Sequence, residues 1–160
     1  MKLSIHSGNI RFAGLGGTGV IKASDIFADV VFRLGYDVKK AEVHGMSQRG
    51  GSLSSDVRWG VSVDSPMISE GECDLLVVME ATQVVVTQGC LKSDGILMQP
   101  SDIDESKLPS AKALNVAMLG RMSTLLAFPL EAWQAALRTN FPEKLWAAND
   151  KAFALGRGEP

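Results

Sequence analysis

The chain has 160 residues, of which 46% are hydrophobic and 21% are charged, and its formal net charge is −2. This length and composition are typical of one globular domain that is long enough to bury a substantial core. A net charge this close to zero excludes a general electrostatic attraction to nucleic acid or to an anionic membrane. We therefore expect a single domain over residues 1–160 with neither kind of partner.

The N-terminal segment and the cysteines give no indication of export. Residues 1–8 lack the apolar core of a signal peptide, and no apolar run reaches the length of a membrane span. The two cysteines, Cys73 and Cys90, do not have the spacing of a zinc or iron–sulfur site. A disulfide between them fits the sequence, but nothing points to an oxidising compartment. We expect a cytoplasmic protein that binds no metal itself.

Residues 10–20 predict a short strand, a glycine-rich turn and the first turn of a helix. Gly14, Gly16 and Gly19 have the G-x-G-x-x-G spacing, and Gly17 adds a fourth glycine. Such a turn brings backbone N–H groups close to an anion at the positive end of a helix dipole. The same glycines would also let the strand, turn and helix pack closely. The spacing alone does not separate these two interpretations.

The residues after this turn predict an amphipathic helix. Apolar side chains recur at helical spacing from Val20 to Leu34, and charged side chains occupy the opposite face. We expect Thr18 to cap this helix and Gly35 to end it in the left-handed conformation.

The rest of the chain alternates between strands and helices. We expect strands at 36–43, 53–59, 75–79 and 96–98, helices at 81–91, 115–126, 130–137 and 145–155, and a turn at Ser93-Asp94-Gly95. In the strand at 53–59, polar residues that include Asp56 and Arg58 alternate with apolar ones, which predicts one face open to water. This order favours an α/β fold: a single Rossmann-like domain with a mostly parallel sheet flanked by helices and a helical C-terminal third.

A second glycine-bounded loop follows the predicted second strand. It contains an imidazole, a hydroxyl, an amide and a guanidinium, and its residues are His44, Gly45, Met46, Ser47, Gln48, Arg49, Gly50 and Gly51. Ligands of open α/β sheets bind outside the carboxyl ends of strands, where this loop should lie beside the first glycine turn. Arg49 could hold a phosphate or carboxylate through two hydrogen bonds. The alternative is a surface turn in which Arg49 pairs with an acidic side chain.

Glu42 stands near the end of the second strand, where dinucleotide-binding domains place a carboxylate on a ribose hydroxyl. A free-standing Rossmann-type dinucleotide-binding protein is therefore one alternative function. The sequence offers no Ser/His/Asp arrangement, paired carboxylates or cluster of metal ligands. We accordingly expect no catalytic residue on this chain and predict a binding or docking component.

Together, the two loops resemble the small subunit, or gamma-type domain, of the 2-oxoacid:ferredoxin oxidoreductases, and the indolepyruvate type is the most similar. The segments that carry the resemblance are Gly14–Val20 and Glu42–Leu53. Residues 57–60, 65–66, 73–76, 115–120 and 149–156 follow the same order, so the likeness extends over nearly the whole chain.

The resemblance implies one subunit of a complex that oxidatively decarboxylates a 2-oxoacid, here an arylpyruvate, to an acyl-CoA and passes the electrons to ferredoxin. Thiamine diphosphate and iron–sulfur clusters would belong to a larger partner subunit, and this chain would bind no cofactor firmly and be inactive alone. The first loop (Gly14, Gly16, Gly17, Thr18 and Gly19) and the second loop would then face the partner's active site or the path of coenzyme A. His44, Gln48 and Arg49 would be the main contacts.

Several alternatives stay open at this point. The complex could act on another 2-oxoacid, the isolated chain could form a homodimer, and the loops could serve only to pack against a partner. The sequence also departs from the family in two places. Thr18 stands where the family usually has glutamine, and the segment between Pro100 and Ala113 is short.

Overall fold

A computed structural model describes residues 3–45 and 51–159. Five strands form one sheet in the order β2-β3-β1-β4-β5. Their bounds are β1 (Gly8–Leu15), β2 (Asp37–His44), β3 (Ser52–Gly60), β4 (Cys73–Val78) and β5 (Leu91–Met98). β4 pairs in parallel with β1 and with β5, whereas β3 is antiparallel to both β1 and β2. Four strands therefore point the same way, which confirms the predicted α/β domain with a mostly parallel sheet.

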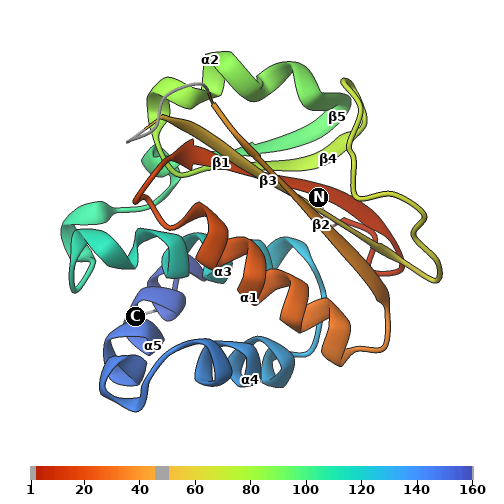
Figure 1. Cartoon of the computed structure of the whole chain (residues 1–160). Coiled ribbons are helices and arrows are strands. Elements are labelled where there is room, and N and C mark those ends of the chain that lie inside the picture. The colour runs from red at the N-terminus through yellow and green to blue at the C-terminus, as the bar shows by residue number, and fades with distance from the viewer. Residues whose placement is uncertain (1–2, 46–50, 160) are drawn as a thin grey trace.

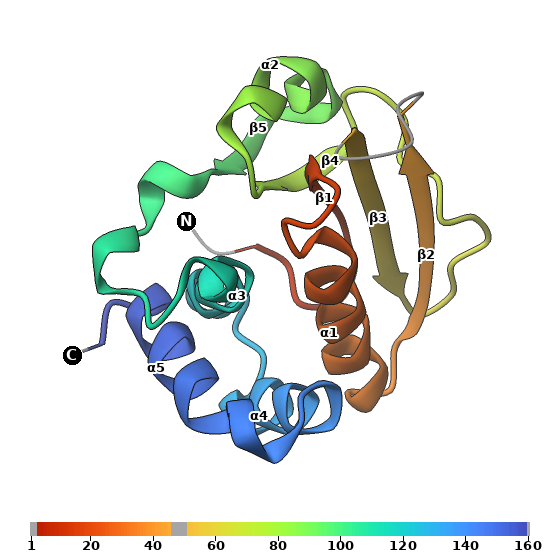
Figure 2. The same cartoon turned by 60° about the vertical axis from the view of Figure 1, so that its left-hand side comes forward.

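Helices cover the two faces of the sheet unequally (Figure 1). The long helices α1 (Val20–Arg33), α3 (Leu114–Leu125), α4 (Leu130–Asn140) and α5 (Trp146–Gly156) lie on one side, as Figure 2 also shows. The short helix α2 (Val84–Thr87) lies on the other side. The helical C-terminal third is thus confirmed. None of the helices in the described part of the chain is long and apolar enough to cross a membrane.

Helix α1 is fixed at both ends by glycines. Gly19 is its N-cap residue with φ 85°, and Gly35 follows its C-terminus with φ 88°, which confirms the predicted left-handed stop. The prediction that Thr18 caps the helix is wrong. Its hydroxyl instead donates to the carbonyl oxygen of Leu15 at 2.6 Å, so Thr18 closes the turn and leaves the helix without a side-chain cap.

An aromatic cluster joins α1 to the sheet and to the outer helices. The ring of Phe27 lies 5.3 Å from Trp59 on β3, 5.9 Å from Trp133 on α4 and 6.1 Å from Phe12 on β1, measured between centroids. All four side chains are buried. Tilted and edge-on pairs at these distances add to the stabilisation that comes from burying apolar area. The main core therefore lies on the α1 side of the sheet.

Two predictions for the segment on the α2 side of the sheet are wrong, one for a helix and one for a turn. The predicted helix at 81–91 is broken into α2 and two flanking 3₁₀ turns, Ala81–Gln83 and Gln88–Cys90. Consecutive β-branched residues are poor helix formers, and Gly89 is another helix breaker, which explains the interruption. The predicted turn at 93–95 instead lies within β5, where the register with β4 is irregular.

Helices α3 and α5 approach each other so closely that only glycine fits at the contact. A Cβ atom on Gly120 would lie 2.1 Å from the carbonyl oxygen of Phe153. One on Gly156 would lie 1.8 Å from the carbonyl oxygen of Ala117. These two glycines therefore set the distance between the helices, which in turn positions the start of α3 against the first glycine loop.

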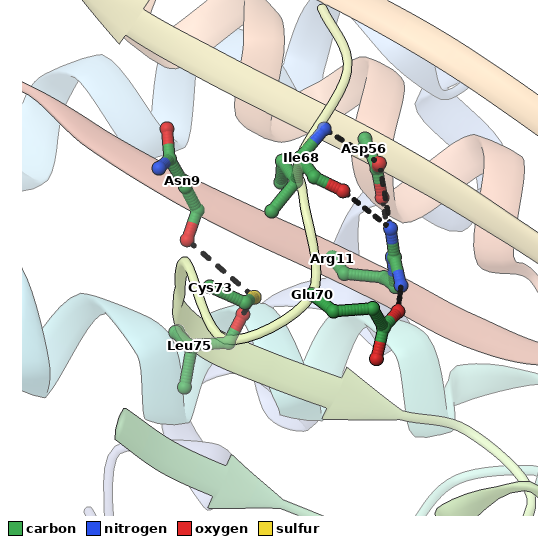
Figure 3. Close-up of polar contacts among 7 residues, drawn as sticks. All are labelled: Asn9, Arg11, Asp56, Ile68, Glu70, Cys73 and Leu75. Atoms are coloured by element: carbon green, nitrogen blue, oxygen red, sulfur yellow. Dashed lines mark hydrogen bonds and ion pairs between the residues drawn. The ribbon is translucent and has the colours of Figure 1, made fainter. Parts of the chain in front are cut away.

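The prediction that one face of β3 is open to water is wrong, because residues 61–72 cover that face. We call this segment the strap. Asp56 is only 3% exposed and forms two hydrogen bonds with Arg11 on the adjacent strand, at 2.6 and 2.9 Å (Figure 3). The same two side chains bind the backbone of Ile68 in the strap, at 3.2 Å to its oxygen and 3.3 Å to its nitrogen. The hydrogen bonds that Arg11 donates to Asp56 raise the pKa of Arg11 and keep it charged.

A second arginine holds the other half of the strap. Arg58 on β3 donates to the carbonyl oxygens of Ser65 at 2.8 Å and Met67 at 3.2 Å, and to the side chain of Asn9 at 2.9 Å. The polar alternation of β3 therefore reflects anchoring of a covering segment and not contact with bulk water.

We predict that Asp56→Asn lowers the free energy of unfolding by about 3 kcal/mol, since it leaves the mostly buried charge of Arg11 without a partner. Urea unfolding measures this loss. The control is Glu70→Gln, because Glu70 is 77% exposed and lies 3.9 Å from the same arginine. Equal losses in the two variants would contradict the proposed role of the Arg11–Asp56 pair.

Candidate functional site

The two glycine loops meet at one edge of the sheet. Leu15 at the end of β1 is paired with Ser52, and His44 at the end of β2 is paired with Leu53. The N–H group of Gly16 donates to the carbonyl oxygen of Gly51 at 3.1 Å. The expectation that both loops lie at the carboxyl ends of β1 and β2 is therefore confirmed.

Part of the second loop lies outside the described residues, namely Met46, Ser47, Gln48, Arg49 and Gly50. Of its other members, His44 and Gly45 are exposed and Gly51 is half-buried.

The glycines of the first loop have different physical roles. A Cβ atom on Gly14 would lie 2.8 Å from Val20, and one on Gly19 would lie 2.6 Å from the Asn115 amide of α3. Both positions therefore serve close packing. Gly17 has φ 86° and open space around it, so its role is conformational and it leaves room for another molecule.

The first loop also presents unpaired backbone donors. The N–H groups of Gly17 and Gly19 have no hydrogen-bond partner among the described residues. The first N–H groups of α1 have no intrahelical acceptor, and no side chain caps them. Donors at the N-terminus of a helix favour negatively charged groups.

A hollow of about 370 Å³ opens beside these donors. Its lining residues are Gly17, Thr18, Gly19, Met79, Ala111, Lys112 and Leu114. Lys112 is exposed and forms no ion pair with a described residue, so its ammonium group is available to an anion. The hollow lies where the carboxyl ends of β1 and β4 adjoin. The helices that follow these strands cover opposite faces of the sheet there, which is the usual crevice for ligands in open α/β sheets.

A second, smaller hollow of about 180 Å³ lies on the α2 side of the same edge. It is lined by Val43, His44, Gly45, Ser52, Leu53, Ser54, Gln83, Val86 and Thr87. Val43 is 52% exposed, Val86 is 63% exposed and the neighbouring Val85 is 74% exposed. Adjacent exposed apolar side chains are typical of surfaces that contact another protein.

The position of Glu42 does not reproduce a dinucleotide site. β3 lies between β1 and β2, so Glu42 stands two strand spacings, or about 10 Å, from the strand that carries the glycine turn. Its carboxylate lies 3.2 Å from the ammonium group of Lys40, which also contacts Asp25 on α1. The geometry therefore disfavours the alternative of a free-standing dinucleotide-binding protein.

Several residues that the fold brings to this edge were not predicted from the sequence. Lys112 and Gln83 come from segments distant in sequence from either loop, so no motif connects them. The sequence did contain a signal for the surface at α2. This helix consists of four consecutive β-branched residues, Val84, Val85, Val86 and Thr87, which are poor helix formers. Such a conflict with helix propensity often marks a functional surface.

The described residues contain no group of three or more His, Cys, Asp or Glu side chains that could hold a metal ion. The whole chain has two cysteines, whereas iron–sulfur clusters are usually held by four. The residues present therefore do not fit a cluster.

The sequence is similar to a known protein family over most of its length. The family model described as pyruvate ferredoxin/flavodoxin oxidoreductase matches residues 9–113. Indolepyruvate oxidoreductase subunit IorB of Archaeoglobus fulgidus is 30% identical, with 92% of each chain covered. The protein of the same name from Methanothermobacter thermautotrophicus is 28% identical, with 94% of this chain and 96% of that protein covered. That alignment spans 189 positions, more than this chain contains, so the relative has residues that this chain lacks.

Solved structures share the fold. The gamma subunit of a keto/oxoacid ferredoxin oxidoreductase from Geobacter sulfurreducens superposes with a TM-score of 0.77 at 24% identity, covering 96% of this chain and 95% of that one. A 2-oxoglutarate:ferredoxin oxidoreductase from Magnetococcus marinus superposes with a TM-score of 0.72 at 19% identity. It covers 97% of this chain but only 31% of that longer one. With the family model matching most of the sequence, the chain belongs to the pyruvate ferredoxin/flavodoxin oxidoreductase family.

Proposed function

We propose that this chain is the small subunit of an indolepyruvate ferredoxin oxidoreductase. The complex oxidatively decarboxylates an arylpyruvate to an acyl-CoA and passes the electrons to ferredoxin. Thiamine diphosphate and iron–sulfur clusters are carried by a larger partner subunit, because this chain has too few cysteines for a cluster. The names of the relatives support the indolepyruvate type.

The observation that carries the proposal is the contact between the two glycine loops, where Gly16 donates to Gly51. This contact joins two segments of the resemblance into one surface at the ligand-binding edge of the sheet. Within the second loop, Gln48 and Arg49 are proposed to reach the partner's active site. The exposed valines Val43, Val85 and Val86 lie beside this loop and support a protein–protein contact there.

The hollow beside the first loop is proposed to lie on the path of coenzyme A. Coenzyme A carries several phosphate groups, and the hollow offers helix N–H donors and the exposed ammonium group of Lys112. Thr18, which stands in place of the usual glutamine, turns its hydroxyl inward to Leu15 and so leaves the hollow to backbone donors.

The direct test is to purify this chain with its larger partner and measure ferredoxin reduction in the presence of coenzyme A. We expect indolepyruvate to give the highest kcat/KM, and we expect no turnover from the isolated chain. Pyruvate and 2-oxoglutarate are the comparison substrates. A higher kcat/KM for either of them would assign the subunit to another 2-oxoacid, and failure to form a complex would refute the proposal.

We predict that Lys112→Gln in the assembled enzyme raises the KM for coenzyme A about tenfold, since a hydrogen bond to a charged group contributes about 1.5 kcal/mol or more. The kcat should change by less than about twofold, because the contact is made equally in the bound substrate and the transition state. Lys107→Gln is the matched control, as Lys107 is 68% exposed and pairs with Asp104 outside the hollow. Equal effects of the two variants would remove Lys112 from the site.

Arg49→Ala separates a role in turnover from a role in packing. We predict that turnover by the complex falls at least about tenfold, because a bidentate contact to an anion would be lost. Size-exclusion chromatography shows whether the complex still assembles. Unchanged turnover in an intact complex would mean that the second loop only packs against the partner.

A further inference from the structure

Two buried thiols lie together on the strap side of the sheet, away from the glycine loops. Cys73 is the first residue of β4, and Cys90 ends the 3₁₀ turn before β5. The strand ladder pairs Cys73 with Leu91, the residue directly after Cys90. Both cysteines are fully buried and both are free.

The geometry brings these thiols within reach of each other. Both side chains belong to the small core cluster on this face, and Cys90 directly precedes the residue with which Cys73 is paired. Paired strands lie about 4.8 Å apart, and disulfides bridge Cα atoms that are about 4.4–6.8 Å apart. We propose that Cys73 and Cys90 are a reversible redox pair, which a peroxide oxidises to a disulfide and a dithiol reduces again.

The surroundings make the two thiols unequal. The neighbouring thiol of Cys73 lowers the pKa of Cys90, and the positive charge of Arg11 acts in the same direction. The same contact with Cys90, together with burial, raises the pKa of Cys73. Cys90 is therefore the thiolate that attacks, and Cys73 is the thiol that resolves the intermediate.

The reaction balances without a metal or further cofactor. The Cys90 thiolate attacks one oxygen of hydrogen peroxide, the O–O bond breaks and the product is a sulfenic acid plus hydroxide, which takes up a proton to give water. The sulfur of Cys73 then attacks the sulfur of Cys90, its proton leaves with the hydroxyl group as water, and the S–S bond forms. In total, two thiols are oxidised by two electrons and one peroxide is reduced to two waters.

The strap controls access to this pair. Its last residues cover the turn that ends at Cys90, since the N–H group of Gly71 donates to the carbonyl oxygen of Gly89 at 3.2 Å. A water-sized oxidant therefore needs the strap to lift. The disulfide would close residues 73–90 into a covalent loop. That loop contains Gln83 and Val86 of the hollow on the α2 side, so oxidation would restrain one side of the surface that is proposed above to contact the partner subunit.

The test is to treat the full chain with hydrogen peroxide, block the remaining thiols with an alkylating reagent and measure the intact mass. We expect the mass to fall by two hydrogen atoms, with no alkylated thiol and with a digest fragment that joins Cys73 to Cys90. A dithiol should restore both thiols. In Cys73→Ala, which lacks the resolving thiol, Cys90 should instead gain oxygen.

Two results would overturn the proposal. One is a wild-type protein that gains oxygen as the variant does, and the other is a pair of thiols that stays unoxidised until the protein is unfolded. Control of access is measured separately with Arg58→Gln, which removes the arginine that binds the strap at Ser65 and Met67. We expect disulfide formation to be several-fold faster in this variant, and an equal rate would refute access through the strap.

Discussion

The candidate site depends on β3, which runs antiparallel between β1 and β2. In a simple dinucleotide-binding sheet the second strand lies next to the first, and a carboxylate at its end reaches the ligand of the glycine turn. Here β3 takes that place, and the chain must return from the end of β2 to the start of β3 at the edge where β1 ends. The second glycine loop is the connection that makes this return. Its contact with the first loop therefore follows from the strand order.

This topology changes what the first glycine loop can do. Gly14 and Gly19 are required because a Cβ atom would collide with Val20 or with Asn115, which is a packing constraint. Gly17 and the uncapped start of α1 keep backbone donors free beside a hollow. The spacing of the motif could not separate packing from anion binding. In the structure Gly14 serves packing, Gly17 is free of close contacts, and Gly19 combines a close contact with an N–H group that has no partner among the described residues.

On the face of the sheet that the strap covers, hydrogen bonds from charged side chains hold the covering segment, and the apolar cluster there is small. Arg11 and Asp56 hold the strap through the backbone of Ile68 (Figure 3). Arg58 holds it through the carbonyl oxygens of Ser65 and Met67, so a segment with few apolar anchors still covers the sheet. The ion pair is mostly buried, and its hydrogen bonds to Ile68 satisfy atoms that would otherwise lose contact with water. The same guanidinium lies near the two thiols, so the charge that anchors the strap also makes the thiols chemically unequal.

The local sequence pattern was sufficient to predict those elements that have a hydrophobic periodicity or a glycine at a position of positive φ. The amphipathic helix from Val20, its stop at Gly35 and the buried strand β4 could all be read from the sequence, because helical spacing, positive φ and continuous apolar runs are properties of neighbouring residues. The two loops could be recognised as a pair only through the family resemblance. Tertiary structure decided the rest: that β3 separates Glu42 from the glycine turn, that Asp56 is buried under the strap, and that Lys112 reaches the hollow. Each of these depends on which distant segments become neighbours, and a pattern of adjacent residues carries no information about that.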